Sequence, residues 1–180
     1  MIEQQNPIAT GATTSLASLM QSYAHYNLWA NTTLVNWLRS KDPATIEQEV
    51  ASSFPSIKLT IVHIWQVQRY WLTILSKEEF VPVDFKGDAE KAFTTLLEHS
   101  ETLARYISEM TAEDISDKTL VVSPWFECNF ENFEYIMQIM NHSTYHRGQI
   151  VTIGRNLGFT DAPMTDYNYY KIYGAGVSTN

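Results

Sequence analysis

The sequence has few of the features that mark secreted, membrane or disulfide-stabilised proteins. Its 180 residues contain a single cysteine, Cys128, so no disulfide can form within the chain. No run of about 18 apolar residues occurs that could cross a bilayer. The first residues, MIEQQNPIATGATTS, also lack the basic region and the apolar stretch of a signal peptide. We therefore expect a cytoplasmic protein that does not associate with membranes.

Basic residues are scarce as well. Twelve Lys and Arg stand against 20 Asp and Glu, which gives a net charge of −8. A negative surface repels phosphate backbones, so nucleic acid is not an expected partner. The chain does have apolar residues (44 %) and aromatic residues (13 %) in amounts that suit a sizeable core. We predict a single domain over residues 1–180, of which residues 1–13 form a flexible or loosely packed N-terminal segment.

Apolar residues recur at intervals of three and four in four segments, the period of an α-helix that buries one stripe. These segments span residues 14–40, 56–76, 88–110 and 131–157. Ser56 and Asp88 are candidate N-caps, and Gly158 is a candidate terminator of the last helix. The run TLVVSPWFECNF has the β-branched and aromatic residues of a short hairpin. The sequence therefore predicts an all-α four-helix bundle with long connections and a possible short hairpin before the last helix.

Two histidines, His142 and His146, interrupt the apolar stripe of the last segment, in the run NHSTYHRGQI. Residues i and i+4 lie one above the other on a helix, so both rings can aim at a point about 2 Å from each, as a divalent metal requires. His63 lies in an apolar stripe of the second segment and supplies a third ligand if the two helices are neighbours. A buried histidine also occurs as a hydrogen-bonded core residue. The spacing alone leaves both interpretations open.

The other polar residues near these helices have different expected places. His25 falls off the main stripe of its helix and His99 stands beside acidic residues, so both are expected on the solvated surface. Gln149 and Asn141 are candidate hydrogen-bond partners for the two rings of the last helix, and exposure on the surface is an equal alternative for Asn141. Gly148 is expected to permit a close helix contact near them.

Four runs of the sequence resemble the DinB/YfiT-like superfamily of four-helix-bundle proteins, which includes proteins assigned as metal-dependent hydrolases. They are YNLWAN, FPSIKLTIVHIWQVQRYW, NHSTYHRGQI and APMTDYNYY, and together they span nearly the whole chain. The resemblance implies that His63, His142 and His146 bind a divalent transition metal ion, zinc or nickel first among them. It also implies a small-molecule substrate, which in related branches is a low-molecular-weight thiol, and a homodimer.

Three neutral imidazoles leave at least one coordination position open, which suits a catalytic site better than a closed structural one. A divalent ion lowers the pKa of bound water or thiol towards neutrality. The first hypothesis is therefore a metal-dependent enzyme, either a hydrolase or a thiol S-transferase. The alternative is a non-enzymatic metal-binding stress-response or interaction module.

A haem site fits the pattern less well, because axial haem ligands do not come from consecutive turns of one helix. The sequence indicates no catalytic base. The carboxylates of Glu127, Glu131 and Glu134 lie near the last helix but suit the charged start of a helix.

Overall fold

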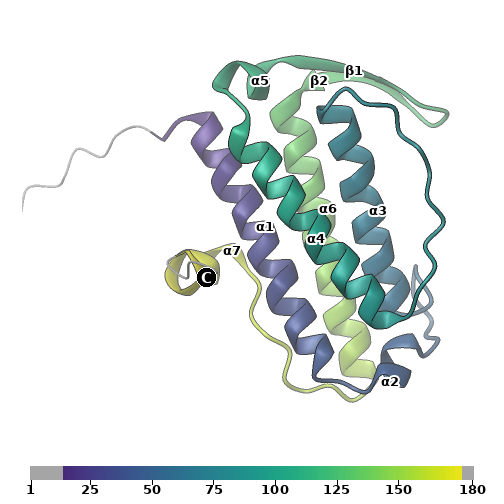
Figure 1. The fold of residues 1–180 in the computed structure, drawn as a ribbon. Helices are drawn as coiled ribbons and strands as arrows, with labels where there is room; N and C mark the ends of the chain where they lie inside the picture. The colour runs from purple at the N-terminus through teal and green to yellow at the C-terminus, as the bar shows by residue number, and fades with distance from the viewer. Residues whose placement is uncertain (1–13, 176–180) are drawn as a thin grey trace, which may run out of the picture.

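Four long helices build the fold, which a computed structural model describes for residues 14–175 (Figure 1). They are α1 (Leu16–Arg39), α3 (Ile57–Leu75), α4 (Ala89–Glu109) and α6 (Asn132–Asn156). Helices α1 and α3 each pack against both α4 and α6. The connection of residues 76–88 returns along the bundle, so α3 and α4 run in the same direction, opposite to α1 and α6 (Figure 1). This confirms the predicted all-α bundle.

Local signals begin and end these helices close to the predicted positions. The side chains of Ser56 and Asp88 accept backbone hydrogen bonds as N-caps of α3 and α4. Helix α6 begins where the carboxylate of Glu134 accepts the backbone N–H of Glu131 at 3.3 Å. Gly158 follows α6 with φ +93°, a conformation that glycine adopts without a steric penalty. The carboxylates of Glu131 and Glu134 therefore cap the start of α6, as expected.

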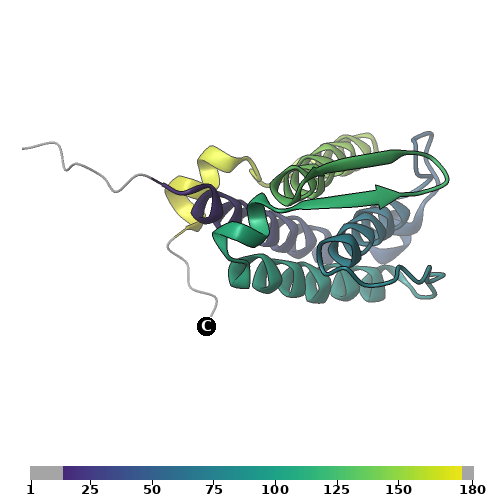
Figure 2. The same ribbon diagram turned by 90° about the horizontal axis from the view of Figure 1, so that it is seen from above.

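Shorter elements fill the connections. Two short helices, α2 (Pro43–Glu47) and α5 (Ala112–Ser116), lie in segments that the sequence analysis treated as loops. The predicted hairpin is present as β1 (Lys118–Val122) and β2 (Glu127–Glu131), paired antiparallel with Leu120 opposite Asn129. It lies across one end of the bundle (Figure 2).

The segment after α6 packs on α1. It contains the short helix α7 (Tyr167–Tyr169) and the π-helical turn η1 (Tyr170–Gly174). The hydroxyl of Tyr26 donates to the carbonyl of Thr165 at 2.9 Å, and Tyr170 is buried beside Tyr26. The prediction for residues 1–13 lies outside the described residues. That residues 1–180 form one domain stays a prediction.

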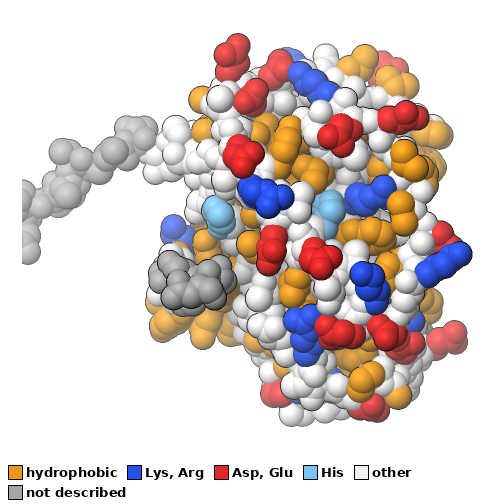
Figure 3. All heavy atoms as spheres, in the orientation of Figure 1, with side chains coloured by type: hydrophobic (Ala, Val, Ile, Leu, Met, Phe, Trp, Pro, Cys, Tyr) orange, Lys and Arg blue, Asp and Glu red, His pale blue; other side chains and the backbone are white. Residues whose placement is uncertain are grey.

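Most of the core forms two apolar clusters, one towards each end of the bundle, and a third, smaller cluster contains Tyr26, Ala30 and Tyr170. The cluster near the hairpin includes Met20, Leu103 and Ile139, and the other includes Leu34 and Ile61. On the surface over α1 and α4, acidic and basic side chains are interspersed (Figure 3). Within residues 14–175, no helix is both long and apolar enough to span a membrane.

Candidate metal centre

Three imidazole rings converge between α3 and α6. Nε2 of His142 lies 3.1 Å from Nε2 of His63 and 3.1 Å from Nε2 of His146. His142 and His146 stand one turn apart on α6, and His63 faces them from α3. One ring nitrogen from each of the three residues lies within 4.8 Å of the other two. The fold thus brings together the three histidines that were selected from the sequence.

Hydrogen bonding alone does not satisfy this arrangement. A neutral imidazole has one N–H, and His146 uses it to donate from Nδ1 to Oε1 of Gln149 at 2.7 Å. Nε2 of His146 is then an acceptor, so Nε2 of His142 has to carry a proton for it. That single proton cannot also serve His63, and Nδ1 of His142 is buried without a partner in the described part of the chain. The ring nitrogens therefore fit a shared cation better than they fit one another.

The distances also suit a metal ion. Zinc binds histidine nitrogens at about 2.0 to 2.1 Å, which places two such nitrogens about 3.3 Å apart in a tetrahedral site. The two observed separations of 3.1 Å are close to that value. Because Gln149 accepts the Nδ1 proton of His146, it leaves the Nε2 lone pair of that ring directed at the centre. The predicted hydrogen bond between Gln149 and a ring of the last helix is therefore confirmed.

The environment keeps the three rings neutral. Burial, with a smaller contribution from the neighbouring histidine charges, lowers the pKa of His63 to about 4 and that of His142 to about 4. Burial also lowers the pKa of His146, against the opposing effect of its hydrogen bond to Gln149. Neutral imidazole is the form that binds metals. The group contains no carboxylate, so a divalent ion would keep its full positive charge there.

Aromatic side chains border the rings. Phe54, which precedes α3, stacks on His63 with ring centroids 4.0 Å apart and meets His146 edge-on at 5.6 Å. Tyr145 is 62 % exposed and lies edge-on to His146 at 5.0 Å. His63 and His142 are only half-buried, so the group lies at the edge of the bundle. Phe54 could not be predicted from the sequence, because an aromatic residue before a helix start has no distinguishing pattern.

The remaining two histidines stand apart from this group. His25 is exposed, as predicted, and its Nε2 lies 3.1 Å from Oγ of Ser108. The prediction for His99 is wrong. His99 is half-buried, and burial together with the nearby charge of Arg69 lowers its pKa to about 4. The acidic neighbours in sequence did not reveal that α4 packs against α3, which brings Arg69 near this ring.

Of the two alternatives for Asn141, the structure shows surface exposure, and the prediction for Gly148 is wrong. Asn141 is exposed and accepts a hydrogen bond from the hydroxyl of Tyr23 at 3.1 Å, and no hydrogen bond joins it to the three rings. Gly148 is exposed, and a Cβ added there would meet no described atom within 4 Å. It therefore mediates no close helix contact.

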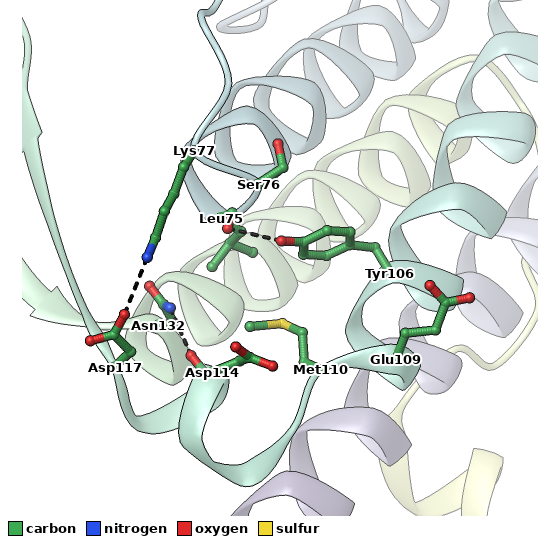
Figure 4. A pocket seen from close by; sticks show the side chains of 9 residues that line it. All are labelled: Leu75, Ser76, Lys77, Tyr106, Glu109, Met110, Asp114, Asp117 and Asn132. Carbon is green, nitrogen blue, oxygen red and sulfur yellow. Dashed lines mark hydrogen bonds and ion pairs between the residues drawn. The ribbon is translucent and has the colours of Figure 1, made fainter.

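A pocket of about 320 Å³ lies away from the histidines, where α3 and α4 end beneath the hairpin (Figure 4). Its polar groups pair mainly with one another. Nζ of Lys77 lies 3.3 Å from a carboxylate oxygen of Asp117, and Nδ2 of Asn132 donates to the carbonyl of Asp114 at 2.7 Å. The hydroxyl of Tyr106 donates to the last carbonyl of α3 at 2.9 Å. These contacts fasten the end of the bundle, so the pocket is better explained by structure than by catalysis.

Comparisons with known proteins agree with the fold and with the resemblance. Residues 13–174 match the family model described as the DinB family. The curated protein named Protein DinB from Bacillus subtilis (strain 168) is 29 % identical over 154 residues, which cover 81 % of this chain and 89 % of that protein. The crystal structure of a DinB-like protein from Bacillus cereus ATCC 10987 is similar with a TM-score of 0.64 and 17 % identity, over 85 % of this chain and 99 % of that one.

Proposed function

This chain belongs to the DinB family, and from that premise we propose that it binds one divalent transition metal ion through His63, His142 and His146 and uses it in catalysis. One observation carries the proposal. Three neutral imidazoles place their Nε2 atoms around one point, and their protons cannot satisfy all of these contacts by hydrogen bonding. Zinc and nickel are the leading candidates, since both accept imidazole ligands.

The proposed reaction is either hydrolysis or transfer of a low-molecular-weight thiol to a small electrophilic substrate. A bound divalent ion would act as a Lewis acid and lower the pKa of a water or thiol ligand. Around it, Gln149 holds the tautomer of His146, while Phe54 and Tyr145 provide aromatic surface beside the rings. The half-buried rings of His63 and His142 support exchange of ligands with solvent.

Metal analysis tests the binding step. Protein purified without a nickel column is expected to contain about one divalent ion per chain, or to take up one equivalent of zinc or nickel after treatment with a chelator. A thermal-shift screen then tests the reaction class, because a ligand that binds only the folded state raises the melting temperature. Small thiols or ester substrates should raise it in the metal-loaded protein and not in the chelated protein. Absence of metal uptake would contradict the proposal.

A second function is favoured by the hairpin. Leu120, Val122 and Trp125 expose 60 %, 69 % and 83 % of their surface, and exposed apolar groups often mark contact sites between proteins. They support the alternative of a non-enzymatic metal-binding module that associates with a partner or with a second copy of the chain. Light scattering of the protein and of a Trp125→Ser variant tests whether the partner is a second copy of the chain. A homodimer formed through the hairpin should dissociate in the variant.

A further inference from the structure

Two motifs from the sequence contribute no ligand to the candidate metal centre, the YNLWAN run on α1 and the arginine that follows His146 on α6. They meet inside the bundle. Nη1 of Arg147 donates to Oδ1 of Asn27 at 2.8 Å and to Oδ1 of Asn31 at 2.9 Å. Arg147 is only 2 % exposed, burial lowers its pKa, and no ion pair to a carboxylate of residues 14–175 neutralises it. A cation held by neutral oxygens in a core needs an explanation.

From Asn31 the hydrogen bonds continue through the other two long helices. Nδ2 of Asn31 donates to Oγ of Ser100 at 3.0 Å. The single hydroxyl proton of Ser100 faces two acceptors, the carbonyl of Leu96 at 2.8 Å and Oε1 of Gln68 at 3.1 Å. Nε2 of Gln68 then donates to Oγ of Ser143 at 3.3 Å. We call Arg147, Asn31, Ser100, Gln68 and Ser143 the polar belt. None of the five is more than 2 % exposed.

The polar belt crosses all four interfaces between the long helices, from α6 to α1, α4, α3 and back to α6. Along the bundle it falls between the two apolar clusters of the core. Apolar side chains can repack when a helix shifts, but a helix that shifts or rotates at the polar belt leaves buried donors and acceptors unpaired, which is unfavourable. A buried polar chain of this kind therefore defines helix register more sharply than it adds stability.

On α6, the polar belt and the histidines occupy adjacent stripes. Ser143 and Arg147 each follow a histidine by one residue, which is about 100° around the helix axis. A ring nitrogen about 5 to 6 Å from the axis moves about 1 Å for every 10° of helix rotation. Metal–ligand distances tolerate only about 0.2 Å. Small rotations of α6 would therefore separate His142 and His146 from His63.

We propose that the polar belt positions the metal ligands. Arg147 holds α6 against α1, and Gln68, five residues after His63, joins α3 to α6 at the level of the histidines. Both are positioning residues, because they act through the helices and touch none of the three rings. This inference rests on the proposed metal site but adds that residues outside the site determine its affinity and geometry.

Two substitutions of similar volume, Gln68→Met and Arg147→Met, break the polar belt at different links. Each variant is titrated with Co²⁺, whose visible absorption reports coordination geometry. We expect affinity 10- to 100-fold below that of the unsubstituted protein and an altered spectrum. Ile107→Ala serves as the control, since it weakens the apolar cluster near the hairpin without touching the polar belt. It should lower the melting temperature yet bind Co²⁺ with the original affinity and spectrum.

A metal-free readout separates this inference from the proposed function. The ring centroids of His63 and His142 lie 4.9 Å apart, so NMR cross-relaxation between their ring protons reports helix alignment without any ion. These signals should weaken in both variants. If they weaken but the unsubstituted protein binds no Co²⁺, the proposed function fails while the inference on helix alignment stands. Signals and Co²⁺ affinity that remain unchanged in the variants overturn the inference while metal binding stands. If Arg147→Met does not fold, Gln68→Met alone decides the result.

Discussion

Helix α6 contributes residues to two polar groups, the polar belt and the three histidines. The two groups differ in how their protons are distributed. In the polar belt, each link from Arg147 to Ser143 pairs a donor with an acceptor, and the hydroxyl proton of Ser100 is shared between Oε1 of Gln68 and the carbonyl of Leu96. Among the described residues, Nε of Arg147 has no partner. In the histidine group, the ring nitrogens face one another and their protons cannot satisfy all the contacts. The first pattern is that of a structural network, and the second is that of a group that could hold a cation.

The two groups also differ in exposure. The polar belt is fully buried, whereas His63 and His142 are half-buried and lie beside the exposed ring of Tyr145. Only the histidine group can exchange ions with solvent. Removal of a histidine should therefore affect metal binding with little effect on folding. Removal of a polar-belt residue should affect folding and, through the alignment of the helices, metal binding.

The largest expected effect is that of Arg147→Ala on folding. The change leaves two asparagine oxygens unpaired and opens a cavity, so the free energy of unfolding of the metal-free protein should fall by about 4 kcal/mol. Urea unfolding in the presence of EDTA measures it. The matched control is Arg155→Ala at the exposed end of α6, which should change stability by less than about 0.5 kcal/mol. A loss of stability below about 1 kcal/mol for Arg147→Ala would contradict a structural role for the polar belt.

The next effect is that of His142→Ala on metal binding. Loss of the central ring should lower zinc affinity at least about 100-fold, or about 2.7 kcal/mol, because two imidazoles from different helices hold the ion poorly. The stability of the metal-free protein should change by less than about 1 kcal/mol, since the ring makes no complete set of hydrogen bonds. Competition with a chromophoric chelator measures the affinity. His25→Ala, at an exposed site on α1, should bind zinc normally.

A smaller effect is expected for Gln149→Ala. Without its carbonyl oxygen, nothing fixes the proton of His146 on Nδ1, and such losses weaken metal affinity about 10- to 100-fold. Asn141→Ala is the matched control, because Asn141 contacts Tyr23 instead of a ring. Equal affinities for the two variants, measured by the same competition, would show that Gln149 does not support the site.

The smallest effect concerns His99, which is half-buried but belongs to neither group. Its pKa is about 4 in the folded protein against an ordinary value of 6.5, so the unfolded chain binds a proton that the folded protein excludes. Stability should be complete above pH 6.5 and fall as the pH decreases towards 4. His99→Leu should reduce that fall, by on the order of 1 kcal/mol at pH 5. Urea midpoints at pH 7.5 and 5 measure it, and parallel curves for the two proteins would contradict the assignment.

Much of the fold could be predicted because it depends on local signals. The recurrence of apolar residues at intervals of three and four predicted the long helices. Ser56 and Asp88 predicted the starts of α3 and α4, and Gly158 predicted the end of α6. Helices α2 and α5 contain five residues each, too few to show a period, and were not predicted.

The candidate site was predictable where it depends on one helix. The i, i+4 spacing of His142 and His146 placed two rings together, while His63 required the assumption that α3 and α6 are neighbours. The polar belt could not be predicted, because Asn31, Gln68 and Ser100 come from three helices and each looks like an ordinary surface residue in sequence. Tertiary pairing alone reveals their role.

The most direct test of the central claim is to titrate the chelator-treated protein with zinc and to measure binding by isothermal titration calorimetry. We predict one ion bound per chain, and loss of that binding in a variant with all three substitutions, His63→Ala, His142→Ala and His146→Ala. A protein that stays empty in excess zinc and nickel, or a triple variant that still binds one equivalent, would contradict the account.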